Sequence, residues 1–134
     1  MQAPSILGFD TGFFRRLHEG SPRAVQAWRD VQEGRFAGVV SCITFFELQR
    51  LGLRGVIPKP YIERLVQNLP VICHTTWLDS PEPLSRGARL AHGLGMSMAD
   101  SLILSALLDA GASTIYTTDS DFDRYAGPVE IVRL

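Results

Sequence analysis

Five acidic residues of the sequence stand where carboxylates could act together, although they fall in four separate segments. They are Asp10, Glu47, Asp100, Asp119 and Asp121. Two carboxylates about 4 Å apart repel each other by about 4 kcal/mol at an effective dielectric constant of about 20. A cluster of them must therefore take up protons, stay open to water or hold cations, and Mg²⁺ and Mn²⁺ prefer oxygen ligands of this kind. The residue types indicate a divalent-metal site that can bind a phosphodiester and activate water.

Each of these carboxylates also has an ordinary structural interpretation when it is taken alone. Asp10 fits a turn at the end of a strand, and Glu47 fits a surface pair with Arg50. Asp100 comes three residues after Ser97, which is the spacing of a helix capping box. The other two aspartates fit an exposed loop. The metal-site hypothesis therefore depends on all five residues meeting in the fold, which local spacing does not decide.

The elements that must position these residues alternate along the chain between apolar runs and helical patterns. The apolar runs predict strands at residues 5–9, 37–42, 70–73, 114–117 and 129–132. The helical patterns, two of them opened by Ser-Pro, predict helices at residues 21–34, around 43–51, and at 59–69, 80–92 and 97–111. Strands separated by helices indicate an α/β protein with a mainly parallel sheet of about five strands, covered on both faces.

All five acidic residues map to the same edge of this predicted sheet. Asp10 follows the first strand, and Glu47 lies one turn into the helix after the second. Asp100 lies in the first turn of a later helix, and Asp119 and Asp121 follow the fourth strand. Parallel sheets bind ligands beyond the carboxyl ends of their strands. We therefore expect the acidic cluster at that edge.

Length and composition bound the class of protein. The chain has 134 residues, of which 46% are hydrophobic and 20% charged, as in a single globular domain. No apolar run approaches about 18 residues, so we expect no membrane segment, and two cysteines are too few for a disulfide framework, which favours the cytoplasm. A net charge of −1 argues against a nucleic-acid binder. Without the five clustered acids, however, nine acidic residues remain against 13 basic ones, a net charge of +4.

The ordered set of motifs resembles the PIN-domain ribonucleases and, among them, the VapC-type toxins of prokaryotic toxin–antitoxin pairs. The matching segments are Phe9-Asp-Thr11, Ser41-Cys-Ile-Thr-Phe-Phe-Glu-Leu48, Gly95-Met-Ser-Met-Ala-Asp-Ser-Leu-Ile103 and Thr117-Thr-Asp-Ser-Asp-Phe122. The resemblance implies a single PIN domain over residues 1–134, folded as an α/β/α sandwich. It also implies an endoribonuclease that uses Mg²⁺ or Mn²⁺ to hydrolyse RNA phosphodiester bonds and leaves a 5′-phosphate and a 3′-hydroxyl.

The resemblance assigns roles to the acidic residues of this sequence. Asp10, Glu47, Asp100 and Asp119 match the metal-binding quartet of the family. Asp121 matches a frequent fifth catalytic carboxylate. One position departs from the family pattern, because Gly12 stands where the family often has Asn, and this puts any side-chain contact from position 12 in doubt.

Four further residues are candidates for contacts with the RNA substrate. Thr11 matches the hydroxyl that the family carries beside the first aspartate, and Thr117 precedes the late aspartates. Arg15 and Arg16 follow Asp10 by little more than one helical turn, so they are placed to contact RNA phosphates. For these two arginines, a solvated helix face is the competing interpretation.

The resemblance also implies partners beyond the RNA substrate. VapC-type proteins commonly form homodimers, and a cognate antitoxin would be expected to occupy the acidic groove. An alternative function stays open, namely a catalytically inactive PIN domain that binds RNA or a partner protein without cutting. The presence of all four acids of the quartet favours the nuclease.

Overall fold

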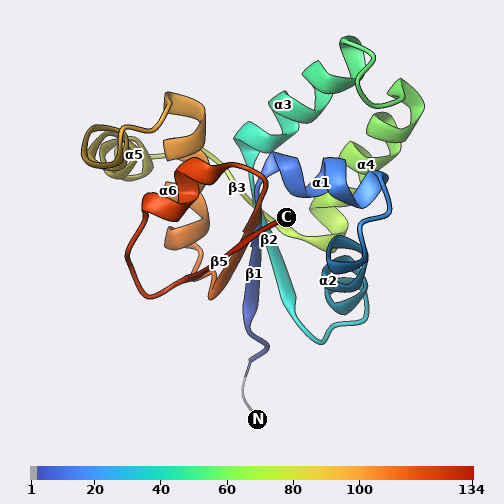
Figure 1. Cartoon of the computed structure of the whole chain (residues 1–134), viewed down its shortest axis with the longest axis horizontal. Coiled ribbons are helices and arrows are strands. Elements are labelled where there is room, and N and C mark those ends of the chain that lie inside the picture. The colour runs from blue at the N-terminus through green and yellow to red at the C-terminus, as the bar shows by residue number, and fades with distance from the viewer. Residues whose placement is uncertain (1–2) are drawn as a thin grey trace.

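The computed structural model describes residues 3–134 and is built on one five-stranded sheet in which every strand is parallel to its neighbours (Figure 1). The strand order is β3-β2-β1-β4-β5. The strands are β1 (Ile6–Phe9), β2 (Ala37–Ser41), β3 (His74–Thr76), β4 (Thr114–Thr117) and β5 (Glu130–Arg133). The helices are α1 (Thr11–His18), α2 (Pro22–Gln32), α3 (Cys42–Leu53), α4 (Lys59–Ile72), α5 (Pro81–Leu94) and α6 (Met98–Asp109), with a short 3-10 helix η1 (Ser120–Arg124).

Helices cover the sheet on both faces, which confirms the predicted α/β/α sandwich. Figure 1 shows α5 and α6 on one side of the sheet and α1, α2 and α4 on the other. Val39 and Val40 are neighbours on β2 but belong to different apolar cores, because successive side chains of a strand point to opposite faces. Val40 packs in the core that contains Phe13 and Trp28, and Val39 packs in the core that contains Ile103. Burial on both faces explains why the strands read as apolar runs.

The predicted strand at residues 70–73 is wrong, because residues 70–72 form the last turn of α4. Leu65 and Leu69 are buried on one face of α4, and Ile72 packs against the same core. Their spacing keeps the helix on the sheet for a further turn, even though Pro70 lacks an N–H group. The third strand starts instead at His74, which lies opposite Val39 of β2.

Helix α1 is absent from the predicted elements. It has only eight residues and begins directly after β1, where Asp10 is its N-cap and accepts a hydrogen bond from the Thr11 N–H. Phe13 and Phe14 are both fully buried, and Phe13 stacks on Phe9 with 4.1 Å between ring centroids. Asp10 therefore forms the short link between β1 and α1, two elements that both contribute buried aromatic side chains to the core.

The strand order creates the place where a site can form. The chain leaves β1 toward β2 on one side of the sheet, while β4 pairs with β1 on the other side. Such a reversal opens a crevice at the carboxyl ends of the two central strands, where α/β proteins bind ligands. Asp10 follows β1 at this point, and Asp119 comes two residues after β4.

Within residues 3–134, no single helix has the length and apolar character needed to cross a membrane. Helices α5 and α6 pass such a test only as a pair, by length and composition, and the pair is bent by 120°.

Candidate active site

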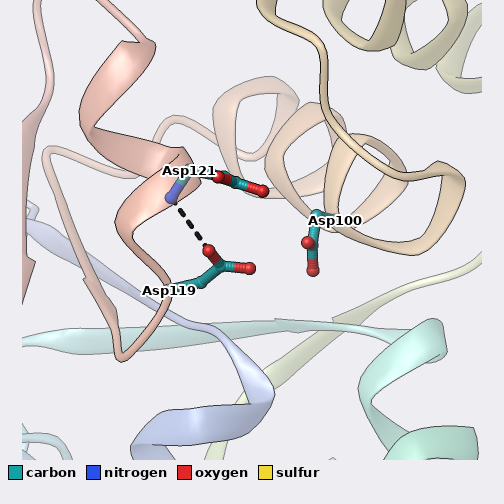
Figure 2. Close-up of side chains that lie close together, drawn as sticks. All are labelled: Asp100, Asp119 and Asp121. Atoms are coloured by element: carbon teal, nitrogen blue, oxygen red, sulfur yellow. Dashed lines mark hydrogen bonds between the residues drawn. The ribbon is translucent and has the colours of Figure 1, made fainter.

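Three aspartates from two neighbouring segments bring their carboxylates together at the carboxyl edge of the sheet (Figure 2). One oxygen from each of Asp100, Asp119 and Asp121 lies within 4.8 Å of the other two. Asp100 comes from the first turn of α6, where its N–H group donates to the Ser97 hydroxyl at 3.2 Å. Asp119 caps η1 by accepting a hydrogen bond from the Asp121 N–H at 2.8 Å. Capping therefore orients the side chain of Asp119 and fixes the backbone of Asp100 and Asp121, and all three side chains are half-buried.

Asp10 lies beside this group and is held more tightly. Its side chain is buried, and its backbone N–H donates to the carbonyl of Tyr116 on β4 at 3.0 Å. One carboxylate oxygen accepts from the Thr11 N–H, and the other accepts from the Thr117 hydroxyl, each at 2.7 Å. The Thr117 hydroxyl also accepts from the Asp119 N–H at 3.0 Å. A single buried threonine thus links Asp10 to Asp119.

Glu47 reaches the site from α3 and meets Thr11. The Thr11 hydroxyl donates a hydrogen bond to Glu47 Oε1 and lies 3.2 Å from the hydroxyl of Thr44. In the part of the chain that the structure describes, Glu47 forms no ion pair with Arg50, so the surface-pair interpretation does not hold. Glu47 is instead half-buried and turned toward the first residue of α1.

The proximity and burial of these carboxylates raise two of their pKa values. Burial raises the pKa of Asp10 to about 6; the charges of Glu47 and Asp119 add to this effect, while the Thr117 and Thr11 hydrogen bonds oppose it. Burial also raises the pKa of Asp100 to about 7, helped by a hydrogen bond and charge repulsion from Asp119. Both shifts favour the neutral acid. A positive charge placed among these oxygens would therefore stabilise the ionised carboxylates.

The predicted substrate contacts divide into two groups. Thr11 and Thr117 both lie in the site and hydrogen-bond to its carboxylates. Arg15 and Arg16, on α1, instead pair with Glu19 at 3.4 and 3.0 Å. The structure places these two arginines in a local surface network, and none of their described ion pairs involves the acidic cluster.

Two residues of the site were missed in the sequence. Arg124 pairs with Asp121 at 3.1 Å, and its guanidinium also donates to the Leu94 carbonyl at 2.9 Å, so it fastens η1 to the end of α5. The signal was the spacing of three residues between Asp121 and Arg124, which places an acid and a base on one helical face. Thr44 is fully buried one turn before Glu47, and a polar residue at such a position in an apolar helix was the signal for it.

The donor set of the cluster fits a divalent cation. Every candidate ligand is a carboxylate oxygen, which suits Mg²⁺ and Mn²⁺ better than the nitrogen and sulfur ligands that zinc favours. Burial and neighbouring carboxylates raise the pKa values of Asp10 and Asp100, and the described ion pair of the cluster joins Arg124 to Asp121 and not to either of them. The residues present therefore fit Mg²⁺ or Mn²⁺.

The comparisons with known proteins agree with this fold and identify the family. The sequence matches the PIN domain family over residues 9–128, so the chain belongs to that family. Similar solved structures include VapBC2 from Rickettsia felis bound to a promoter DNA fragment, at 15% identity and a TM-score of 0.73, covering 96% of this chain and 98% of the other. VapBC-1 from nontypeable Haemophilus influenzae is 18% identical with a TM-score of 0.71, covering 96% and 97% of the two chains.

A toxin–antitoxin complex from Klebsiella pneumoniae is 21% identical with a TM-score of 0.66, covering 93% of this chain and 99% of the other. At these identities the likeness shows the shared fold. No curated protein matches the sequence.

Proposed function

We propose that this protein is a metal-dependent ribonuclease that hydrolyses RNA phosphodiester bonds. The observation that carries the proposal is the meeting of Asp100, Asp119 and Asp121 within 4.8 Å at the sheet edge, beside Asp10 and Glu47. Membership of the PIN domain family supports it. Bound Mg²⁺ or Mn²⁺ would supply charge for the phosphodiester and lower the pKa of water.

The residues of the site have different proposed roles in metal binding and substrate contact. Asp100, Asp119 and Asp121 hold the cation, and Asp10 faces the same space from β1. Glu47 is oriented by Thr11 and adds its negative charge beside Asp10, and Thr117 links Asp10 to Asp119 and keeps these two in place. Thr11 begins α1 and contacts both Asp10 and Glu47, which makes it the first candidate for an RNA contact.

A cleavage assay with matched aspartate variants tests this proposal. Wild-type protein should cut single-stranded RNA with Mg²⁺, leave 5′-phosphate ends and stop when EDTA is added. Asp100→Asn should lower the rate by roughly 100-fold or more, as removal of charge stabilisation does in other active sites. Asp123→Asn is the control, because Asp123 is exposed and pairs with Arg133 away from the cluster. Cleavage that survives EDTA or Asp100→Asn would overturn the metal mechanism.

We further propose that the protein is the toxin of a type II toxin–antitoxin pair and works in the cytoplasm as a homodimer. Support comes from the VapC-like motifs and from the fold shared with chains of VapBC structures. Expression alone should arrest growth, and coexpression of the small protein encoded beside it should relieve the arrest. Unimpaired growth with active nuclease in the cells would exclude the toxin role and leave an RNA-processing enzyme.

A second candidate function is a PIN domain that binds RNA or a partner without cutting. The buried Asp10 favours this alternative only if its raised pKa keeps the site protonated under working conditions. RNA binding without cleavage in both Mg²⁺ and Mn²⁺ at about pH 8, where both shifted aspartates ionise, would establish it.

A further inference from the structure

Gly12 on α1 faces Thr118, the residue directly before Asp119. A Cβ atom built at position 12 would lie 1.9 Å from Thr118 Oγ1, 2.9 Å from its Cβ and 3.0 Å from its Cγ2. Cβ atoms essentially never approach another heavy atom closer than 3.0 Å. The side chain of Thr118 therefore fills the space that any side chain at position 12 would need.

Rotation of the Thr118 side chain cannot relieve this contact. Turning about the Cα–Cβ bond moves Oγ1 and Cγ2 but leaves the Thr118 Cβ in place, 2.9 Å from the added atom. Any side chain at position 12 must therefore push the backbone of the loop between β4 and η1 away from α1. The constraint is on the loop itself and not on one rotamer.

The loop carries this displacement into the acidic cluster. On one side of Thr118, the buried Thr117 hydroxyl donates to Asp10 at 2.7 Å and accepts from the Asp119 N–H at 3.0 Å. On the other side, Asp119 caps η1 through the Asp121 N–H. A shift of Thr118 would strain these bonds and move Asp119 and Asp121 relative to Asp10 and Asp100.

We propose that Thr118 is a positioning residue, whose shape, seated against Gly12, sets the distance between the β4–η1 aspartates and Asp10. Gly12 is the residue that permits this seating. The inference rests on the proposed function, since it assigns the contact to the geometry of the cation site. It also explains the departure at position 12, where the space for a side chain is already taken from the opposite segment.

A series of substitutions at positions 12 and 118 tests whether the shape of the Thr118 side chain determines metal binding. The measured quantity is the Mn²⁺ affinity, obtained by titration. Gly12→Ala should weaken Mn²⁺ binding by roughly 10- to 100-fold, the usual range when the support of a metal ligand is disturbed. Adding Thr118→Ala removes two of the three close contacts and should restore part of the affinity. Adding Thr118→Gly instead removes all three and should restore the affinity of Thr118→Gly alone.

Two controls keep the result specific. Gly93→Ala adds a methyl group to another helix at a place with no atom within 4 Å, and it should leave Mn²⁺ affinity unchanged. Thr118→Val keeps the branched shape of the side chain and removes the hydroxyl, so it should bind Mn²⁺ with the same affinity as wild type. If Thr118→Val loses as much Mn²⁺ affinity as Gly12→Ala, the hydroxyl of Thr118 and not its shape is responsible, and the proposal is overturned.

The possible results also distinguish a failure of this inference from a failure of the proposed metal-dependent function. If the wild-type protein binds no Mn²⁺, the metal site is refuted. The thermal stabilities of wild type, Gly12→Ala and the double variant with Thr118→Gly then show whether the contact between Gly12 and Thr118 exists. If wild type binds Mn²⁺ and Gly12→Ala binds equally well, the positioning role is wrong. If Gly12→Ala fails to fold and Thr118→Gly does not rescue folding and binding in the double variant, the steric contact itself is wrong.

Discussion

Asp10 and Asp100 are stabilised in the protonated form, which makes the metal-free protein sensitive to pH. Burial is the main cause at both positions, and neighbouring carboxylates add to it. Asp10 follows the fully buried Phe9 at the end of β1, and its own side chain is only 5% exposed, which limits its access to water. These two aspartates therefore stabilise the metal-free fold less as they ionise.

The first prediction concerns stability against pH without metal. The folded pKa values of about 6 and 7 lie above the ordinary value of 3.8, so the folded chain binds more protons than the unfolded chain between about pH 4 and pH 7. Stability should therefore fall as pH rises through that window, and Asp10 alone should account for about 1 kcal/mol of the fall between pH 5 and pH 8. Urea unfolding in EDTA at pH 5 and pH 8 measures this. Mg²⁺ at pH 8 should restore stability. The same slope in Asp100→Asn would contradict the assignment to Asp100.

The second prediction concerns Thr117, whose hydroxyl lowers the pKa of Asp10. Thr117→Val keeps the shape but removes the hydrogen bonds to Asp10 and from Asp119, so the pKa of Asp10 should rise. The acid limb of the cleavage profile should then move to higher pH, with a rate roughly tenfold lower near pH 6.5. Thr114→Val, on the same strand but outside the site, is the control. An unchanged acid limb in Thr117→Val would show that Asp10 does not control it.

At the scale of elements, local signals and tertiary packing agree in most places and conflict at α4. Ser97 was predicted to open a helix and does cap α6, and residues 114–117 form β4 as expected. The segment 70–73 reads locally as a strand because proline and β-branched residues disfavour a helix. Its apolar residues nevertheless continue the buried stripe of α4, and packing decides the outcome.

The third prediction uses this conflict. Pro70→Ala restores an N–H group within α4 and should stabilise the protein by about 1 kcal/mol, less than the 3 kcal/mol typical of a helix centre because Pro70 is in the last turn. Pro60→Ala is the matched control at the start of the same helix, where proline is tolerated and the change should be near zero. Thermal unfolding of the two variants compares them. Equal melting temperatures would mean that Pro70 causes no strain in α4.

At the scale of the whole molecule, the site depends on strand order more than on any local motif. The residues of the site come from segments up to 111 positions apart, and β1 lies between β2 and β4. The sheet edge could be predicted from the alternation of strands and helices. The short distances among Asp100, Asp119 and Asp121 could not, because they depend on η1 and its cap. The role of Thr118 could not be predicted either, since its contact with Gly12 joins the β4–η1 loop to helix α1, which is distant in sequence.

The charges are unevenly distributed over the molecule. Five of its 14 acidic residues gather at one edge, while the rest of the chain carries a net charge of +4. A divalent cation in the cluster would remove much of the local repulsion for an RNA phosphate. The net charge of −1 is therefore the sum of an acidic cluster and a positively charged remainder of the chain.

The most direct test of the divalent-metal site is calorimetric titration of the metal-free protein with Mn²⁺ at pH 8, for wild type and for Asp119→Asn. An Asn at position 119 keeps the shape of the side chain and can still cap η1, so the fold should survive the change. We predict saturable binding to wild type and a loss of affinity of at least about 100-fold in Asp119→Asn. Equal Mn²⁺ affinity in the two proteins would contradict the metal site at this edge of the sheet.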